Sequence, residues 1–314
     1  MVKNLEDSGR SQPDNTEKRN ALVKQQGKGN RGMAMRLEHV DFVYGQGNGY
    51  ETHALKDVSL EIQDGEFIGI VGHTGSGKST LTHLLNGLEK PSSGTIYYNE
   101  QNIADKAFSL QKLRSKVGLV FQYPEHQLFE VSVIKDVEFG PRNMGLSNLE
   151  VEKRSYDALK LVGITDDLLD VSPYALSGGQ KRRVAIAGVL AMQPEILILD
   201  EPTAGLDPKG RDEILGLLQK LHQEQNITIL LVSHSMDDVA RYTQRILVMN
   251  HGQLVLDGAP RKIFHYEEEL NVIGLGVPQS TRVMHLLKQV GMPIDMDAIT
   301  PEEAVDSIDV CLRR

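Results

Sequence analysis

The sequence contains no apolar run long enough to cross a membrane. Its longest apolar runs, at residues 196–199 and 227–232, have the length of a β-strand, whereas a membrane helix needs about 18–20 apolar residues. Residues 1–31 also lack the apolar segment of a signal peptide. If the protein works at a membrane, other subunits must therefore hold it there.

Cysteine and net positive charge are also scarce. Cys311 is the only cysteine, so a disulfide within the chain is excluded and a reducing cytosol is favoured. Lys and Arg number 34 against 43 Asp and Glu, and the net charge of -9 argues against nucleic acid as the main partner. The apolar content of 40% and the charged content of 25% are ordinary for a soluble globular protein.

The composition divides the chain into three parts. Residues 1–32 are polar with few apolar positions, and we predict that they form a disordered N-terminal extension. Residues 33–257 alternate apolar strands with helices, which predicts an α/β fold with a parallel sheet covered on both faces. Within this part, residues 124–190 are predicted to be an inserted helical subdomain. Residues 258–314 are predicted to be a small helical C-terminal domain.

Local patterns predict the individual elements. Partly exposed strands are expected at residues 35–44 and 53–62, around a glycine-rich turn. Apolar strands are expected at residues 66–72, 117–122, 195–202 and 227–234, and helices at residues 78–88, 148–163, 210–223 and 279–291. Helical spacing aligns Leu81, Leu84, Leu85 and Leu88 in the first helix, and Val283, Leu286, Leu287 and Val290 in the last.

A further helix is predicted to begin near the C-terminus. Thr300 suits the N-cap, Pro301 the first helical position, and Glu303 the closing residue of a capping box. This helix and the one at residues 279–291 make the C-terminal part a candidate docking or dimerisation surface.

Residues 72–80, "GHTGSGKST", fit the phosphate-binding P-loop pattern. An apolar strand precedes them and a helix follows, as the pattern requires. The glycines allow backbone N–H groups to surround phosphates, Lys78 would neutralise the β and γ oxygens, and the Ser79 hydroxyl would bind Mg²⁺. The candidate nucleotide-binding residues are Gly72, His73, Thr74, Gly75, Ser76, Gly77, Lys78, Ser79 and Thr80.

Polar residues follow three further strands. Asp200 and Glu201 end the strand "ILILDEP"; Asp200 suits Mg²⁺, and Glu201 suits the base that orients or deprotonates water. His234 follows the strand at residues 227–233, and a neutral imidazole there would hydrogen-bond the γ-phosphate. Gln122 ends another strand, where its amide would contact Mg²⁺ and water. Alone, neither His234 nor Gln122 identifies a site.

A second anion-seeking turn lies about a hundred residues after the P-loop. Ser177, Gly178, Gly179 and Gln180 begin a predicted helix, and a helix N-terminus attracts anions. Only one of the two turns has a complete nucleotide pocket around it.

Together these motifs resemble the ATP-binding cassette (ABC) ATPases over about residues 35–257. Besides the P-loop, Gln122 corresponds to the family's Q-loop glutamine, and "LSGGQ" at 176–180 corresponds to its signature. The strand "ILILDEP" corresponds to its carboxylate strand, "AGLD" at 204–207 to its D-loop, and His234 to its switch histidine. These motifs occur in the family's order. The resemblance implies ATP and Mg²⁺ as cofactors, Glu201 as the general base, and Tyr44 as the residue that stacks on adenine. It also implies an antiparallel β subdomain beside the parallel sheet.

In this family two ATPase subunits pair head to tail. Each ATP then lies between one subunit's P-loop and the other's signature. The resemblance therefore implies that the turn at residues 177–180 serves the neighbour's nucleotide. Because the chain holds one set of motifs, the neighbour must be another polypeptide.

The surrounding sequence is similar to the ATPases of energy-coupling factor (ECF) transporters, which import vitamins and metal ions. The similarity lies in "VFQYPEHQLFEVSVIKDVEFGP", in "SGGQKRRVAIAGVLAMQPEILILDEPTAGLDP" and in the tail "VPQSTRV…TPEEAV". The variants "GHTGSGKST" and "QLFE" are most similar to the second ATPase of shared, group II systems. This implies a peripheral protein on the cytoplasmic side of the cell membrane, with a sister ATPase, a membrane T component and interchangeable small S components.

Acidic residues follow the Q-loop glutamine. In the ECF family, coupling helices of the T component carry arginines and sit in a groove near the Q-loop. Glu125, Glu130, Asp136 and Glu138 lie in the corresponding segment. They either pair with such arginines or form a solvated acidic face, and for each residue alone the solvated face is favoured.

Three other functions remain open at this point. One is the ATPase of a dedicated cobalt or nickel ECF transporter or of another ABC importer. A remote one is an ABC protein acting on DNA or ribosomes, although such proteins usually carry two cassettes or a long coiled-coil insertion, and this chain has neither. An inactive regulatory subunit is disfavoured by the presence of Lys78, Asp200, Glu201 and His234.

Overall fold

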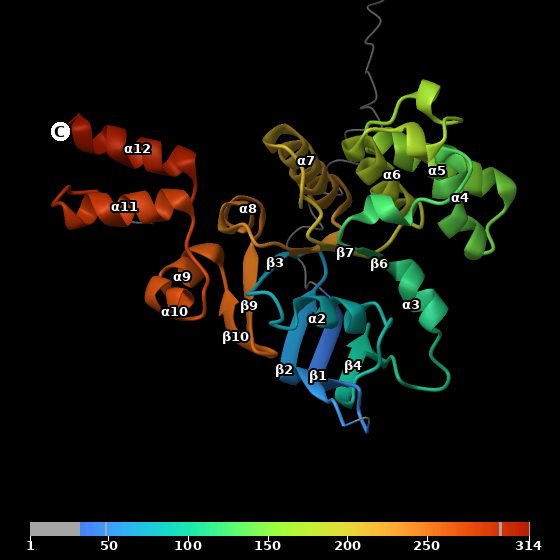
Figure 1. Cartoon of the computed structure of the whole chain (residues 1–314), viewed down its shortest axis with the longest axis horizontal. Coiled ribbons are helices and arrows are strands. Elements are labelled where there is room, and N and C mark those ends of the chain that lie inside the picture. Colours follow the sequence, from blue (N-terminus) through green and yellow to red (C-terminus); the bar gives the residue numbers. More distant parts are fainter. Residues whose placement is uncertain (1–31, 48, 295–296, 314) are drawn as a thin grey trace, which may run out of the picture. The chain divides into compact units, whose positions relative to one another are not determined.

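Two β-sheets and the helices around them form the described part of the chain (Figure 1). The computed structural model describes residues 32–47, 49–294 and 297–313. The disordered extension predicted at residues 1–32 lies outside the described residues, except for Gly32. Among the described helices, none is long and apolar enough to cross a bilayer.

The larger sheet consists of β3 (Phe67–Val71), β6 (Val117–Val120), β7 (Ile196–Asp200), β8 (Thr228–Val232), β9 (Arg245–Asn250) and β10 (Gln253–Gly258). Its strand order is β10-β9-β3-β8-β7-β6, and all neighbours are parallel except β9 and β10. Every residue of β3, β7 and β8 is buried, as expected where helices cover both faces of a parallel sheet. The predicted parallel sheet is confirmed.

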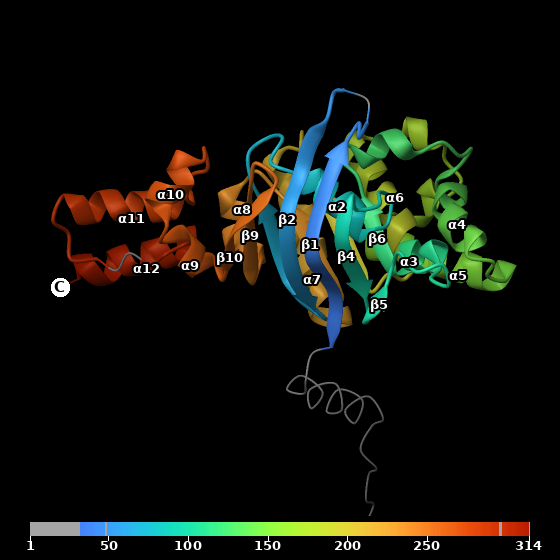
Figure 2. The ribbon, with the colours of Figure 1, turned by 90° about the horizontal axis from the view of Figure 1, so that it is seen from below.

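The smaller, antiparallel sheet consists of β1 (Met33–Tyr44), β2 (Thr52–Gln63), β4 (Ser93–Tyr98) and β5 (Gln101–Asn102). Figure 2 shows β2, β1 and β4 side by side. One hydrophobic core joins this sheet, the larger sheet and helix α2 (Lys78–Leu85), with Leu37, Leu60, Leu84 and Ile70 among its members. This packing fixes the start of α2 at the end of β3.

Two predicted elements end earlier than their sequence pattern suggested. Helix α2 stops at Leu85, so Leu88 lies beyond it and is 46% exposed, because Gly87 turns the chain with a φ of 70°. Strand β6 stops at Val120, which places Gln122 in the loop after the strand.

The helices between α2 and β9 are α3 (Leu110–Lys116), α4 (Val133–Asn143), α5 (Asn148–Leu161), α6 (Gly178–Leu190), α7 (Pro208–Gln225) and α8 (Met236–Tyr242). A second core joins α4 to α7 with β7 and β8 through side chains such as Val137, Leu159, Val184 and Leu215. Residues 124–190 are helical or irregular in the structure, as predicted. The boundaries of this subdomain stay a prediction.

The C-terminal helices are α9 (Pro260–Phe264), α10 (Glu267–Val272), α11 (Gln279–Gln289) and α12 (Pro301–Leu312). Figures 1 and 2 place α11 and α12 at the opposite end of the sheets from α4 and α5. Met284 and Ala304 form the core between α11 and α12. On the predicted apolar face of α11, Val283, Leu286 and Val290 are exposed, and only Leu287 packs against that core.

The cap of α12 differs from the prediction in one contact. Thr300 is the N-cap and accepts a hydrogen bond from the Glu303 N–H, and Pro301 opens the helix, as predicted. The Glu303 carboxylate, however, accepts from the Ile299 N–H at 2.9 Å, one residue before the cap. Glu303 also pairs with Arg261, which draws its side chain away from a regular capping box.

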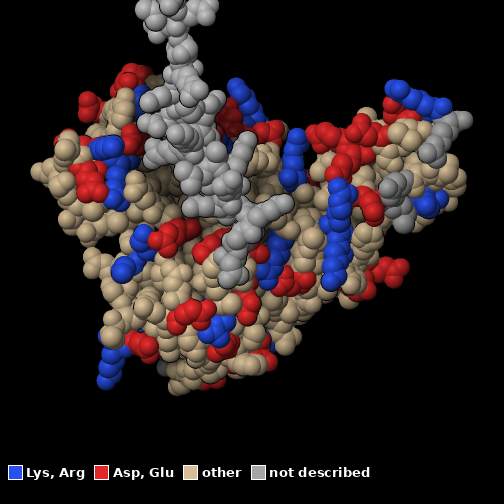
Figure 3. Space-filling view, turned by 180° about the vertical axis from the view of Figure 1, so that it is seen from behind, with Lys and Arg blue, Asp and Glu red and all other residues tan. Residues whose placement is uncertain are grey.

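Charges of both signs are scattered over the face seen in Figure 3. Figure 3 shows Lys and Arg side chains interspersed with Asp and Glu side chains over the visible face. Ion pairs account for part of this mixture, as in the contacts of Arg245 with Glu66 and Asp257.

Candidate functional site

Four neighbouring strands of the larger sheet end at one edge, where the predicted site residues lie. Strands β3, β8, β7 and β6 are adjacent and parallel, so their carboxyl ends face the same way. The loop at residues 72–77 follows β3, and His234 follows β8. Asp200 ends β7, and Gln122 follows β6. The sheet thereby gathers four motifs that are far apart in the sequence.

The P-loop at residues 72–77 has a backbone that requires glycine. Gly75 and Gly77 have φ values of 80° and 103°. A Cβ atom on Gly77 would lie 2.6 Å from the carbonyl oxygen of Ala54. Gly77 is also the N-cap of α2, and no side chain caps this helix. The first N–H groups of α2 can therefore bind an anion.

The other residues of the loop differ in their hydrogen bonds and in their exposure to solvent. His73 Nε2 lies 3.1 Å from Oδ1 of Asn250, and the Ser76 N–H donates to the carbonyl of His73. The Ser76 hydroxyl is buried and has no hydrogen-bond partner among the described residues. Thr74 and Gly75 are exposed at the loop tip.

Lys78 points back across the loop that precedes it. Its Nζ donates to the carbonyl oxygens of Gly72 and His73 at 2.8 and 3.1 Å, and the residue is 6% exposed. Burial lowers the pKa of Lys78, and the charges of Glu201 and Asp200 oppose that shift. The ammonium group thus lies within electrostatic reach of both carboxylates.

The side chains of Gln122 and His234 both contact the carboxylate of Glu201. Gln122 Nε2 donates to Glu201 Oε2 at 3.1 Å, and His234 Nε2 lies 2.6 Å from Glu201 Oε1. Glu201 has a φ of 50°, a left-handed backbone that a non-glycine residue adopts only where its surroundings hold it. Both carboxylate oxygens are therefore oriented by side chains from neighbouring strand ends.

Asp200 and Ser79 supply oxygen atoms that fit Mg²⁺. Asp200 is 7% exposed, and its carboxylate makes no hydrogen bond or ion pair with the described residues. The Ser79 hydroxyl is exposed at the start of α2 and is likewise without a partner in the described chain. A carboxylate, a hydroxyl and the amide oxygen of Gln122 form the all-oxygen set that this hard cation prefers.

Tyr44 lies beside the first turn of α2. Its hydroxyl is 3.2 Å from Oγ1 of Thr80, and its ring packs edge-on against Phe42 with centroids 4.7 Å apart. Tyr44 is 41% exposed, so part of the ring is free to contact a flat ligand.

The turn at residues 177–180 belongs to a different part of the structure. Ser177 caps α6 and accepts from the Gln180 N–H, while Gln180 Oε1 accepts from the Ser177 N–H, so the capping box is complete. A Cβ atom on Gly178 or Gly179 would meet nothing within 4 Å. In the described chain no hydrogen bond or ion pair joins this turn to residues 72–80, and the structure does not bring the two anion-seeking turns together.

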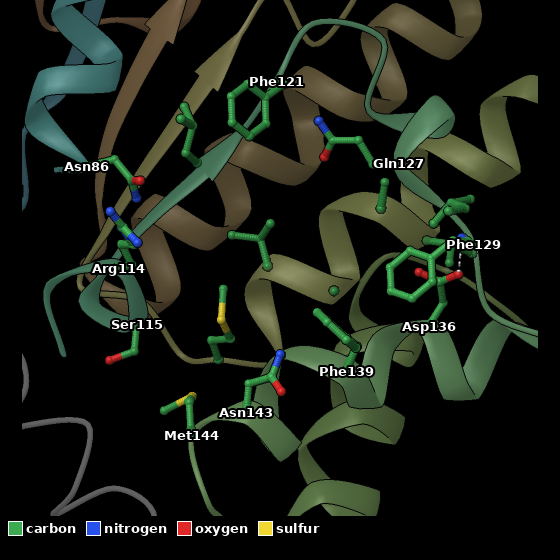
Figure 4. A pocket seen from close by; sticks show the side chains of 18 of the residues that line it. Asn86, Arg114, Ser115, Phe121, Gln127, Phe129, Asp136, Phe139, Asn143 and Met144 are labelled. Carbon is green, nitrogen blue, oxygen red and sulfur yellow. Dashed lines mark hydrogen bonds between the residues drawn. The ribbon is translucent and has the colours of Figure 1, made fainter. Parts of the chain in front are cut away.

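A mostly apolar groove of about 560 Å³ lies between α3, α4 and α6 (Figure 4). Figure 4 shows Phe129, Phe139 and Asp136 on one side of it, and Asn86 and Arg114 on the other. Asp136 accepts hydrogen bonds from the N–H groups of Phe129 and Glu130, each at 2.9 Å. Burial raises the pKa of Asp136, and these two hydrogen bonds limit the rise.

The four acidic residues after Gln122 have different surroundings. Glu125 pairs with Arg182, and Glu138 is buried between Lys135 and Arg142. A single solvated acidic face is therefore wrong as a description of this segment, because its helices turn two of the carboxylates inward. Asp136 lines the groove and accepts a hydrogen bond from the Glu130 N–H, and the Glu130 carboxylate has no hydrogen-bond or ion-pair partner in the described chain.

Two arginines that connect the motifs were missed by sequence reasoning. Arg182 contacts Glu125 and the carbonyl oxygens of Pro202 and Ala204. Arg211, near the start of α7, pairs with Asp238 and donates to Ser235, the residue after His234. The available signal was a basic residue just after a motif, but the sequence does not show which of three consecutive basic residues at 181–183 points inward.

Comparison with known proteins agrees with this geometry. A family model described as ABC transporter matches residues 55–204. The energy-coupling factor transporter ATP-binding protein EcfA2 of Caldanaerobacter subterraneus subsp. tengcongensis is 55% identical over 276 residues, which are 88% of this chain and 96% of that protein. EcfA2 of Clostridium tetani is 53% identical over 273 residues, 87% of this chain and 95% of its own.

Solved structures show the same similarity. The structure of cbiO1 from Clostridium perfringens, described as part of the ABC transporter complex cbiONQ, has a TM-score of 0.69 and 42% identity, and covers 82% of this chain and 99% of its own. A dimeric post-hydrolysis state of the ATP-binding cassette MJ0796, bound to ADP and Pi, has a TM-score of 0.65 and 33% identity, and covers 72% and 98%.

Proposed function

Because the chain belongs to the ATP-binding proteins of energy-coupling factor transporters, within the ABC transporter family, and is an ATP-hydrolysing transporter subunit, we propose that it drives the uptake of vitamins or other micronutrients. The complex around it contains membrane components. In the proposal these are a T component and interchangeable S components, with a sister ATPase beside this chain. One observation carries the proposal. The chain has one set of candidate phosphate-binding residues, at 72–80, and a capped helix start at residues 177–180 that makes no hydrogen bond or ion pair with them in the described chain.

The proposed roles of the site residues follow from their positions. ATP binds with its triphosphate on residues 72–80, where Lys78 neutralises the β and γ oxygens and the N–H groups of α2 contact the phosphates. Tyr44 stacks on the adenine. Ser79, Asp200 and Gln122 hold Mg²⁺, which when bound neutralises charge on the phosphate oxygens.

Glu201 is the proposed general base. As the water oxygen bonds to the γ-phosphorus and the bond to the bridging oxygen breaks, a Glu201 carboxylate oxygen accepts the water proton, and ADP and phosphate leave. Gln122 and His234 orient the carboxylate through the contacts described above. His234 also hydrogen-bonds the γ-phosphate.

The turn at residues 177–180 is proposed to complete the sister subunit's site. Ser177, Gly178, Gly179 and Gln180 would meet the γ-phosphate held by the partner's P-loop, because an exposed helix N-terminus favours negative charge. ATP then joins the two subunits and its hydrolysis releases them. The pairing of two cassettes is supported by the similar MJ0796 cassette, which is described as dimeric and bound to ADP and Pi.

The groove between α3, α4 and α6 is the proposed docking site for the membrane T component. Its apolar wall suits an inserted helix, and Asp136 with the neighbouring Glu130 offers carboxylates to the arginines of such a helix. Glu125 and Glu138 are engaged within the chain and are not part of this proposal. Docking would place the protein on the cytoplasmic side of the cell membrane.

A dedicated cobalt or nickel transporter is the second candidate. It is supported by the likeness to cbiO1, which is described as part of the complex cbiONQ. The two candidates share the ATPase chemistry and differ in the membrane proteins around it.

The test is to purify the tagged full-length chain from native membranes in mild detergent and identify its partners. We expect a sister ATPase, one T component and several S components. A single dedicated metal-binding S component would favour the second candidate. Recovery of soluble partners alone would contradict the transport proposal and leave the ATPase in place.

A further inference from the structure

Arg182 is a buried cation that has no role in the steps proposed above. It lies in the second turn of α6, and its side chain is 2% exposed. Its Nε and Nη2 donate to the two carboxylate oxygens of Glu125 at 3.1 and 2.7 Å. Its Nη1 donates to the backbone carbonyl oxygens of Pro202 and Ala204 at 3.0 and 2.7 Å. Four hydrogen bonds thus fix the guanidinium group.

The acceptors of Arg182 belong to two segments that flank proposed catalytic residues. Glu125 lies three residues after Gln122, in the short 3-10 helix Pro124–Gln127. Pro202 directly follows Glu201, and the Ala204 N–H donates to the carbonyl oxygen of Glu201 at 3.1 Å. One side chain on α6 therefore connects the loop after Gln122 with the loop after Glu201.

The loop that begins at Glu201 needs such a support. The backbone of Glu201 is left-handed, with a φ of 50°, a conformation that persists in a non-glycine residue only when surrounding contacts determine it. The two carbonyl groups that Arg182 binds lie one and three residues after this position. The planar guanidinium can serve a carboxylate and two carbonyls at once, which a lysine ammonium cannot match in geometry.

We propose that Arg182 is a positioning residue for Glu201. It holds the backbone of residues 201–204 in place and ties that loop through Glu125 to the segment after Gln122. A displacement of residues 123–127, which lead into the groove wall at Leu128 and Phe129, is thereby transmitted to Glu201. The inference rests on the proposed role of Glu201 as the general base.

A buried ion pair that served stability alone would behave differently. An apolar side chain of similar volume often replaces such a pair at little or no loss. A structural role therefore predicts that turnover follows global stability, whereas positioning predicts a loss of kcat that stability does not explain.

The test compares Arg182→Lys, Arg182→Met and Glu125→Gln in the transporter complex purified through the tagged full-length chain. We expect kcat for ATP to fall about tenfold or more in both Arg182 variants, while KM changes by less than about threefold, because a small misplacement of a catalytic group affects turnover more than binding. Glu125→Gln should reduce kcat less, since the hydrogen bonds that Arg182 donates to Pro202 and Ala204 remain. In a double variant with Arg182→Lys, Glu125→Gln should lower kcat little further.

Hydrogen exchange separates positioning from general loosening. In Arg182→Lys we expect faster exchange at the amides of residues 202–207, with exchange in the centre of α7 unchanged. The matched control is Arg154→Met, which removes the Arg154–Glu150 pair within α5 and should leave kcat unchanged. If Arg182→Met does not fold, Arg182→Lys and Glu125→Gln carry the test.

Two results would overturn the inference. One is a folded Arg182→Lys complex that hydrolyses ATP at the parent rate. The other is uniformly faster exchange throughout the described helices, together with a matching loss of stability. A Glu201→Gln reference in the same preparation distinguishes a failure of the proposed base, because parent turnover in that variant would contradict the role of Glu201 itself.

Discussion

The P-loop edge of the sheet and the turn before α6 are both built to attract anions, but their surroundings differ. At the sheet edge, Lys78 contacts two carbonyl groups, and Glu201 is held by Gln122 and His234. At the turn, Ser177 and Gln180 cap only each other, and the space beside Gly178 is open. The first site is organised within the chain, whereas in the described chain no hydrogen bond or ion pair joins the second to the phosphate-binding residues at 72–80. This asymmetry is what a shared site between two subunits requires.

The largest effect is expected from Lys78→Ala at the sheet edge. Removing the buried ammonium group leaves the β and γ oxygens without their main positive charge, so ATP affinity should fall by about a hundredfold or more. Equilibrium binding of a fluorescent ATP analogue measures this. Lys220→Ala, on the exposed face of α7, is the control and should bind as the parent does. Unchanged affinity in Lys78→Ala would refute the phosphate role of Lys78.

Glu201→Gln should separate turnover from binding at the same edge. The amide keeps the size of the side chain but cannot accept the water proton, so kcat should fall by about a hundredfold or more while ATP still binds. Steady-state hydrolysis and analytical ultracentrifugation with ATP would show low turnover and a trapped dimer. Glu224→Gln, at an exposed position near the end of α7, serves as the control. Turnover at the parent rate in Glu201→Gln would contradict the role of Glu201 as the general base.

Gly178→Asp tests the turn at residues 177–180 without disturbing helix α6, which begins there. A Cβ atom at this position meets no neighbour within 4 Å, and a carboxylate favours a helix N-terminus, so the chain should fold normally. The added charge would repel the partner's γ-phosphate, and hydrolysis by the complex should fall by about tenfold or more. ATP binding to the isolated chain should not change. Gly178→Asn, which has the same shape without the charge, should lose less; equal losses would contradict an electrostatic role.

The smallest effect is expected on stability, from Glu138 in α4, which packs against α6, the helix that begins at the turn of residues 177–180. Glu138 is 2% exposed and pairs with Lys135 and Arg142. Burial alone would raise the pKa of Glu138, but the two cations outweigh it and hold the pKa below its usual value of 4.5. The stabilisation is therefore present above about pH 4.5 and is lost as the pH falls through the lower, folded-state pKa.

Glu138→Gln should accordingly reduce the free energy of unfolding by about 1–2 kcal/mol at pH 7, and by less below pH 4.5. Urea unfolding at several pH values measures both. Glu152→Gln, on the exposed face of α5, should change little at any pH. A Glu138→Gln deficit that grows as the pH falls would mean that the pKa shift has the opposite sign.

The order of motifs along the strands was enough to predict that most of the candidate nucleotide-binding residues lie at one edge of the sheet. Asp200 ends an apolar strand, His234 and the P-loop each follow one, and the carboxyl ends of parallel strands lie at one edge of the sheet. The helix that begins at Ser177–Gly179 was also predicted, and the structure adds the capping box between Ser177 and Gln180.

Contacts between distant segments were not predictable in the same way. The sequence shows basic residues at 181–183, but only the packing of α6 decides that Arg182 turns inward to meet Glu125 and Ala204. The same holds for Glu138, whose burial depends on how α4 rotates against its neighbours. Leu88 followed the helical spacing and still lies outside α2, because Gly87 ended the helix first.

The central claim is that the turn at residues 177–180 serves a nucleotide held by another subunit. The most direct measurement uses an ATP analogue with a photoreactive group on the γ-phosphate and the Lys78→Ala chain, whose own P-loop is disabled. We predict that label appears on residues 177–180 only when a sister subunit with an intact P-loop is present. Label on that turn of the Lys78→Ala chain without a sister subunit, unchanged when the sister subunit is added, would contradict the account.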